Sequence, residues 1–141
     1  MKNIEEIGIL LIEDNPGDRR LIEVMLKEIT SFNYRFIVAE TLKDGCAQIS
    51  NNKVDIILLD LNLPDSTGRN TFDTLIDFDK HIPVVLVSGT EDLALSVAML
   101  REGAQDYIFK NSLTSQLLEK SIQYSIKRKQ AELFQILSNE I

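Results

Sequence analysis

The sequence predicts an α/β fold in which helices cover both faces of a five-stranded parallel sheet. Two observations lead to this expectation. Short continuous apolar runs, typical of strands buried on both faces, alternate five times with segments of helical spacing. Several of these runs end in an acidic, hydroxyl or basic residue, as expected where parallel strands meet a ligand-binding sheet edge. The economical architecture is a doubly wound sandwich with right-handed crossovers.

The first predicted strand covers residues 7–12 and is followed by two acids, Glu13 and Asp14. Asn15 can then cap free backbone amides, and Pro16 is preset for the first position of a helix. Apolar residues recur at helical spacing after this point. This pattern predicts an amphipathic helix.

The second predicted strand covers residues 34–39, and Thr41 is expected to cap the helix that follows it. The third runs from Val54 to Asp60, so a continuous apolar segment ends in a carboxylate. The segment 61–68 is rich in turn residues and long enough to carry function on a loop. Another helix is predicted after this loop.

The fourth predicted strand begins at Pro83 and closes at Ser88, and a helix runs from Asp92 to Gly103. The fifth strand covers residues 107–110 and ends in a lysine. A flavodoxin-like strand order of 2-1-3-4-5 would place the first and third strands side by side, where the winding of the sheet reverses.

The final helix is predicted to begin near residues 112–113 and to reach about Asn139, farther than a sheet of this size extends. It carries an apolar stripe that is interrupted by Lys129. The stripe suggests a coiled-coil homodimer or a helix leading into a further domain, and a frayed tail is the alternative. The residues of the stripe are Ile122, Ile126, Leu133 and Ile136.

Composition supports one soluble globular domain. Of 141 residues, 44% are apolar and 26% charged, and no apolar run approaches the roughly 18 residues needed to cross a bilayer. The first six residues hold two glutamates and one lysine and so carry a net negative side-chain charge, unlike a secretory signal, so we expect a cytoplasmic protein without membrane contact. A net charge of −7 argues against direct nucleic acid binding. Cys46, the one cysteine, can form neither an internal disulfide nor a metal site alone.

Acids from the first and third predicted strands, Glu13, Asp14 and Asp60, would converge at one sheet edge. Carboxylates this close repel one another unless a cation is present or their pKa values shift. Mg²⁺ prefers oxygen ligands and is commonly held by one or two carboxylates together with phosphate oxygens. Ser88 and Lys110 would face the same groove. Such a set would surround a carboxylate that can attack phosphorus.

This pattern resembles the receiver domains of two-component response regulators, over roughly residues 5–125. The resemblance implies that Asp60 accepts a phosphoryl group from a sensor histidine kinase or phosphotransfer protein, and that Lys110 contacts that group. It also implies that Mg²⁺ is held by three side chains and one backbone carbonyl. These belong to Glu13, Asp14 and Asp60, and the carbonyl to Asn62.

The resemblance further implies a conformational switch. Ser88 would be the switch hydroxyl and Tyr107 the switch aromatic, altering a face formed by the fourth helix, fifth strand and fifth helix. That face would regulate a partner or a downstream domain. Asn62 and Thr90 stand at positions that tune the lifetime of the phosphoryl group in this family.

Two residues depart from the pattern of the family. Glu13 stands where many members have aspartate, and Asn111 follows the lysine where many have proline, so a cis peptide is not assumed there. We divide the chain into a receiver domain, residues 1–125, and an extension of the last helix, residues 126–141. The run 124–132 resembles the linkers that follow receivers, which favours a piece of a larger signalling protein.

Two other classes of function stay open. Haloacid-dehalogenase-type phosphatases also use an aspartyl nucleophile and Mg²⁺, but they generally carry a second aspartate two residues later. This chain has Asn62 there, which cannot shuttle a proton. A receiver takes part in its own phosphorylation and dephosphorylation without being an enzyme. The third class is an interaction module that is never phosphorylated.

Overall fold

The central sheet has five parallel strands in the spatial order β2-β1-β3-β6-β7, which confirms the predicted order 2-1-3-4-5 across the sheet. This computed structural model describes residues 6–139, so the ends of the predicted domain and extension, residues 1–5 and 140–141, lie outside it. The strands are β1 (Glu6–Ile12), β2 (Asn33–Ala39), β3 (Ile56–Leu59), β6 (Val84–Ser88) and β7 (Asp106–Phe109).

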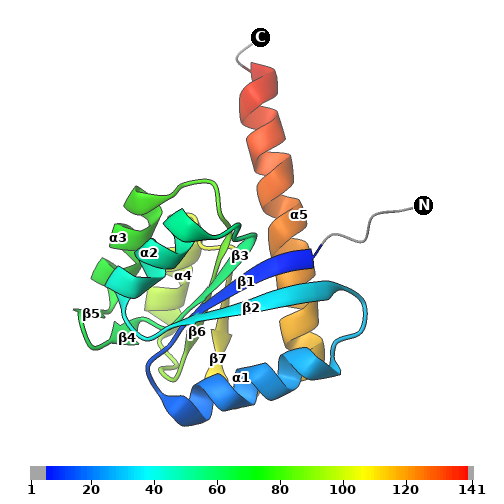
Figure 1. The fold of residues 1–141 in the computed structure, drawn as a ribbon. Helices are drawn as coiled ribbons and strands as arrows, with labels where there is room; N and C mark the ends of the chain where they lie inside the picture. The colour runs from blue at the N-terminus through cyan, green and yellow to red at the C-terminus, as the bar shows by residue number, and fades with distance from the viewer. Residues whose placement is uncertain (1–5, 140–141) are drawn as a thin grey trace.

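Helices cover both faces of this sheet, as Figure 1 shows. One core cluster joins the sheet to residues of three helices, and a second cluster joins the opposite face to residues of two. The first group is α2 (Leu42–Asn51), α3 (Arg69–Phe78) and α4 (Leu93–Arg101). The second group is α1 (Pro16–Glu28) and α5 (Ser115–Asn139). The predicted doubly wound sandwich is confirmed.

The apolar runs are continuous because each strand contributes side chains to the core clusters on both faces of the sheet. Side chains alternate across a strand, so neighbouring residues face opposite sides of the sheet. In β1, Leu10 and Ile12 join one cluster, while Ile9 and Leu11 join the other. All four residues of β3 are buried in the same way. A strand with helices on both faces therefore has no polar side.

Three predicted helix starts are confirmed by side-chain caps. In each case the capping oxygen accepts a hydrogen bond from the backbone N–H three residues later, at 3.0 Å. Such a bond satisfies an amide that would otherwise lack a partner in the first turn. The capping residues are Asn15, Thr41 and Asp92.

The loop predicted after Asp60 contains a small antiparallel hairpin, formed by β4 (Asn62–Leu63) and β5 (Ser66–Thr67). At its tip, the two carboxylate oxygens of Asp65 accept hydrogen bonds from the amides of Leu42 (2.9 Å) and Lys43 (3.0 Å). The hairpin therefore caps the start of α2 from a distant part of the chain.

The predicted start of the last helix was wrong by a few residues. A short 3₁₀ helix, η1 (Lys110–Ser112), follows β7, and α5 begins only at Ser115. The reason is a local cap: the Thr114 hydroxyl accepts a hydrogen bond from the amide of Leu117 at 3.1 Å. The helix continues to Asn139 and extends past the sheet at the top of Figure 1.

Much of the predicted stripe on α5 contacts the rest of the chain. Ile122 is fully buried in the core, and Ile126 packs against it. Lys129, which interrupts the stripe, has only 16% of its side chain exposed and lines a small pocket together with Leu133. Ile136 is 55% exposed. Ile122 and Ile126 therefore attach the helix to the core, and Leu133 lines a pocket with residues 54–55 and 81–83, next to the strands.

Candidate functional site

The predicted site residues lie at the carboxyl edge of the sheet. Ile12 and Leu59 are paired at the ends of β1 and β3, so the residues that follow them are neighbours. The amide of Asp60 donates to the carbonyl of Ile12 at 3.0 Å, which fixes Asp60 beside Glu13. The adjacent strand β6 ends in Ser88.

The acids form a cluster suited to a hard cation. Carboxylate oxygens of Glu13, Asp14 and Asp60 lie within 4.8 Å of one another. Glu13 is 1% exposed and Asp60 6%, while Asp14 faces solvent, so the cluster opens outward on one side. Oxygen donors at this spacing fit Mg²⁺. Asn62 lies next to the cluster, since its amide donates to the Asp60 carboxylate at 3.1 Å.

The ammonium of Lys110 contacts this cluster. Its Nζ lies 2.6 Å from Glu13 Oε1 and 3.2 Å from Asp60 Oδ2. A third carboxylate, that of Asp18 on the first turn of α1, lies 2.7 Å from the same nitrogen. Asp18 was missed by sequence reasoning, because an acid in a first helical turn is ordinarily explained by the helix dipole.

Charge and burial shift the ionisation of two of these groups. Burial, with the hydrogen bond and charge of Asp60, raises the pKa of Glu13 to about 7, although Lys110 opposes the change. Burial disfavours the charged Lys110, but its contacts with Asp18 and Glu13 and the charge of Asp60 outweigh this and raise the pKa of the amine. Burial is thus the first reason that Glu13 holds a proton more tightly than an ordinary glutamate.

Sequence reasoning also missed Arg19, whose side chain binds the backbone of Glu13 and Asp14. Its Nη1 donates to the carbonyls of Glu13 (3.3 Å) and Asp14 (3.0 Å) and forms an ion pair with Glu40 at 3.1 Å. The two acids precede α1, and Arg19 belongs to that helix. The first turns of α1 therefore brace the loop that carries the acids.

The two predicted switch residues, Ser88 and Tyr107, both contact Thr90. The buried Ser88 hydroxyl accepts a hydrogen bond from the amide of Thr90 at 3.2 Å. The Tyr107 hydroxyl donates to the carbonyl of Thr90 at 3.4 Å, and its ring packs edge-on against Phe109. Strand β6 pairs with β7, with Leu86 opposite Tyr107. One short segment therefore contacts both predicted switch side chains.

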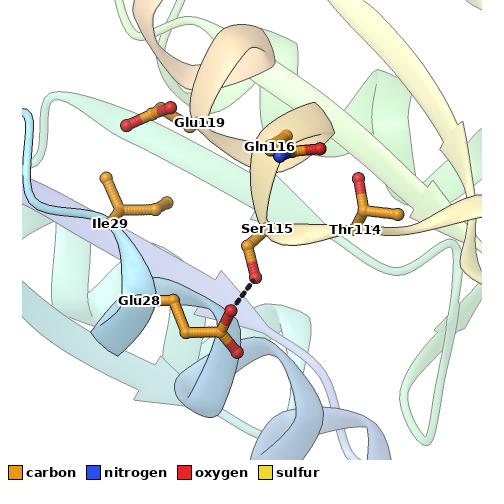
Figure 2. Close-up of a pocket in the computed structure, with 6 residues that line it drawn as sticks. All are labelled: Glu28, Ile29, Thr114, Ser115, Gln116 and Glu119. Atoms are coloured by element: carbon orange, nitrogen blue, oxygen red, sulfur yellow. Dashed lines mark hydrogen bonds between the residues drawn. The ribbon is translucent and has the colours of Figure 1, made fainter.

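A polar pocket of about 370 Å³ lies elsewhere, between the end of α1 and the start of α5, and Figure 2 shows its lining. The Ser115 hydroxyl donates to the Glu28 carboxylate at 3.0 Å across it. No predicted site residue lines this pocket. Over residues 6–139, no helix is long and apolar enough to cross a membrane.

Comparisons with known proteins agree with this geometry. Residues 9–122 match the family called response regulator receiver domain. The chain is 33% identical to the cell cycle transcriptional regulator CtrA of Caulobacter vibrioides over 102 residues, covering 72% of this chain and 43% of that protein. It is 32% identical to the KDP operon transcriptional regulatory protein KdpE of Escherichia coli over 103 residues, covering 73% and 44%. The chain thus spans less than half the length of these relatives.

Solved structures show the same fold. A signal receiver domain from Vibrio parahaemolyticus superposes with a TM-score of 0.79 at 26% sequence identity. The match covers 92% of this chain and 97% of that one. The likeness therefore includes the five-stranded sheet and the helices on both of its faces.

Proposed function

The chain belongs to the family of response regulator receiver domains, and from this premise we propose that Asp60 accepts a phosphoryl group in a Mg²⁺-dependent reaction. One observation carries the proposal. The Asp60 carboxylate lies at the sheet edge, belongs to an acid cluster that fits a divalent cation, and is 3.2 Å from the ammonium of Lys110. Membership of this family supports a role in two-component signalling.

The chemistry we propose is a displacement at phosphorus. A carboxylate oxygen of Asp60 forms the new P–O bond while the bond between phosphorus and the donor atom breaks. Lys110 donates hydrogen bonds to the phosphoryl oxygens. Glu13, Asp14 and Asp60, with the carbonyl of Asn62, would hold Mg²⁺, which when bound stabilises charge on those oxygens.

The switch we propose runs through Thr90. A phosphoryl group on Asp60 offers the Ser88 hydroxyl a new acceptor, and Ser88 would move toward it with its neighbour Thr90. Since Tyr107 donates to the carbonyl of Thr90, that movement removes its hydrogen bond and shifts the ring. The surface of α4, β7 and α5 would change as a result. Asn62 and Thr90, next to the site, would tune how long the phosphoryl group survives.

The partner we propose is a sensor histidine kinase or a phosphotransfer protein in the cytoplasm. Residues 1–125 would form the receiver and residues 126–141 an extension that reaches a downstream domain or a second copy of the chain. The end of α5 supports this extension, because Phe134, Ile136 and Leu137 expose 70%, 55% and 62% of their surface. Exposed apolar side chains so close together are typical of a contact surface.

Labelling tests the proposed acceptor. Wild-type protein incubated with radiolabelled acetyl phosphate should take up phosphate only when Mg²⁺ is present, and Asp60→Asn should abolish the uptake. Asp44→Asn is the matched control, because Asp44 is an exposed acid on α2 that contacts none of the site residues. Uptake by Asp60→Asn at the wild-type level would overturn the proposal.

A further inference from the structure

Among the ion pairs of residues 6–139, the Asp18 side chain reaches the site through Lys110. Its Oδ2 lies 2.7 Å from Lys110 Nζ, although the two residues are 92 positions apart in the sequence. The Asp18 side chain is 35% exposed, whereas that of Glu13, on the inner side of the same ammonium, is 1% exposed. Lys110 is therefore held between a buried acid and an acid at the rim.

The three contacts of Lys110 match the capacity of its amine. An ammonium group has three N–H donors and no acceptor. Its three carboxylate partners are Glu13 (2.6 Å), Asp18 (2.7 Å) and Asp60 (3.2 Å). Two of these, Glu13 and Asp60, also belong to the acid cluster that fits a divalent cation, and Asp18 does not.

A divalent cation in the cluster would compete with the ammonium for acceptors. Two positive charges repel, so a cation held by Glu13 would weaken the contact between that carboxylate and Lys110, which is 2.6 Å in this structure. Asp18 is outside the cluster, so its carboxylate would be left to Lys110 as an acceptor. Without Asp18, the ammonium would retain only acceptors that the metal also needs.

We propose that Asp18 is a positioning residue, which keeps the Lys110 ammonium beside Asp60 while a divalent cation occupies Glu13, Asp14 and Asp60. The inference rests on the proposed function, because it assigns Asp18 a part in the same phosphoryl-accepting site. It predicts that Asp18 eases metal binding through Lys110 rather than by adding a ligand.

The chain offers a closely matched control. Asp18 and Asp44 each stand three residues after a capping side chain and donate their amide to it at 3.0 Å. Both are acids in the first turn of a helix, where their charge favours the helix dipole equally. They differ in that Asp18 contacts Lys110. Any common effect of removing a first-turn carboxylate therefore cancels in the comparison.

Titration calorimetry with Mg²⁺ tests the proposal. Asp18→Asn should weaken Mg²⁺ binding about tenfold, the factor expected when one charge-assisted hydrogen bond is lost, and Asp44→Asn by less than about twofold. In a Lys110→Met background, Asp18→Asn should lose most of its effect, since no ammonium remains to compete. Asp18→Glu, which keeps the charge, should recover part of the affinity.

Two results would overturn the inference. Equal Mg²⁺ affinities of Asp18→Asn and Asp44→Asn would show that the contact has no role in metal binding. An equally large effect of Asp18→Asn with and without Lys110 would show that its charge acts directly on the metal. If all variants bind Mg²⁺ as expected but the wild type takes up no phosphoryl group, the proposed function fails while the role of Asp18 in metal binding stands.

Discussion

At the scale of single residues, the site is defined by excess negative charge at the edge of the sheet. Glu13, Asp14, Asp60 and Lys110 lie together as the order of the strands predicts, because each follows or ends a parallel strand. Asp18 could not be placed in the same way. Its contact depends on how closely the first turn of α1 approaches the end of β7, which no spacing in the sequence encodes.

The raised pKa of Glu13 predicts how stability depends on pH in metal-free protein. A carboxyl group with a pKa of about 7 when folded, against an ordinary 4.5, binds its proton more tightly in the folded state. Its contribution therefore stabilises the fold as pH falls from about 7 toward about 4.5, and is lost above about 7.

Urea unfolding with a chelator at about pH 8 and about pH 5.5 measures this contribution. Glu13→Gln removes the titrating group. At the higher pH, the variant should therefore have a larger free energy of unfolding, relative to wild type, than it has at the lower pH. A difference between the two proteins that does not change with pH would contradict the assignment to Glu13.

Two serines on α5 predict opposite effects of the same substitution. The Ser125 hydroxyl is fully buried and has no hydrogen-bond partner within residues 6–139, whereas the Ser121 hydroxyl donates to Asp106 at 2.7 Å. Ser125→Ala should leave the free energy of unfolding unchanged or raise it by about 1 kcal/mol, and Ser121→Ala should lower it by about 1 kcal/mol. Denaturant unfolding of both variants checks this, and a loss of stability in Ser125→Ala would contradict it.

At the scale of elements, sequence patterns predicted the strands and caps well and the irregular segments poorly. Strand boundaries agree with the structure within about two residues because apolar runs mark buried strands directly. The hairpin after Asp60 was missed because each of its strands has only two residues, too few for a pattern. The 3₁₀ helix at Lys110–Ser112 was missed because its three residues are also too few for a pattern.

The hairpin predicts a distant cap on α2. Asp65 is exposed, and slight desolvation of its carboxylate opposes the charge, but hydrogen bonds from the amides of Leu42 and Lys43 outweigh this and lower its pKa. Asp65→Ala should lower the free energy of unfolding by about 0.5–1 kcal/mol, the range of a helix cap. The difference in stability from wild type should shrink as pH falls below 3.8, the ordinary pKa of an aspartate. In that range the wild-type carboxylate takes up a proton and loses its charge. A variant as stable as wild type at neutral pH would contradict the capping role.

At the scale of the whole molecule, the alternation of strands and helices sufficed to predict the architecture. The family was predicted from polar residues at the strand ends, such as Asp60 and Lys110, which are not needed to form the hydrophobic core. The surroundings of α5 were less predictable. Gln105 donates a hydrogen bond to Glu132 of this helix at 3.2 Å. Leu133 lines a pocket together with residues 54–55 and 81–83, so much of the apolar stripe contacts its own chain.

The exposed end of α5 predicts self-association in solution. Light scattering over a range of concentrations should show a dimer for the full chain, because burial of Phe134 and Leu137 removes apolar surface from water. Phe134→Ser combined with Leu137→Ser should give a monomer. Tyr124→Ser is the control, since Tyr124 is 63% exposed but lies some three helical turns earlier. The same molar mass for all three proteins would contradict a dimer formed by this segment.

The central claim is that one carboxylate at the edge of the sheet carries phosphorus. Peptide mass spectrometry of the full chain after treatment with acetyl phosphate and Mg²⁺ tests it most directly. We predict a single phosphoryl group on the peptide that contains Asp60, and none when the metal is chelated. Phosphorylation at another residue, or its absence from protein that binds Mg²⁺, would contradict the account.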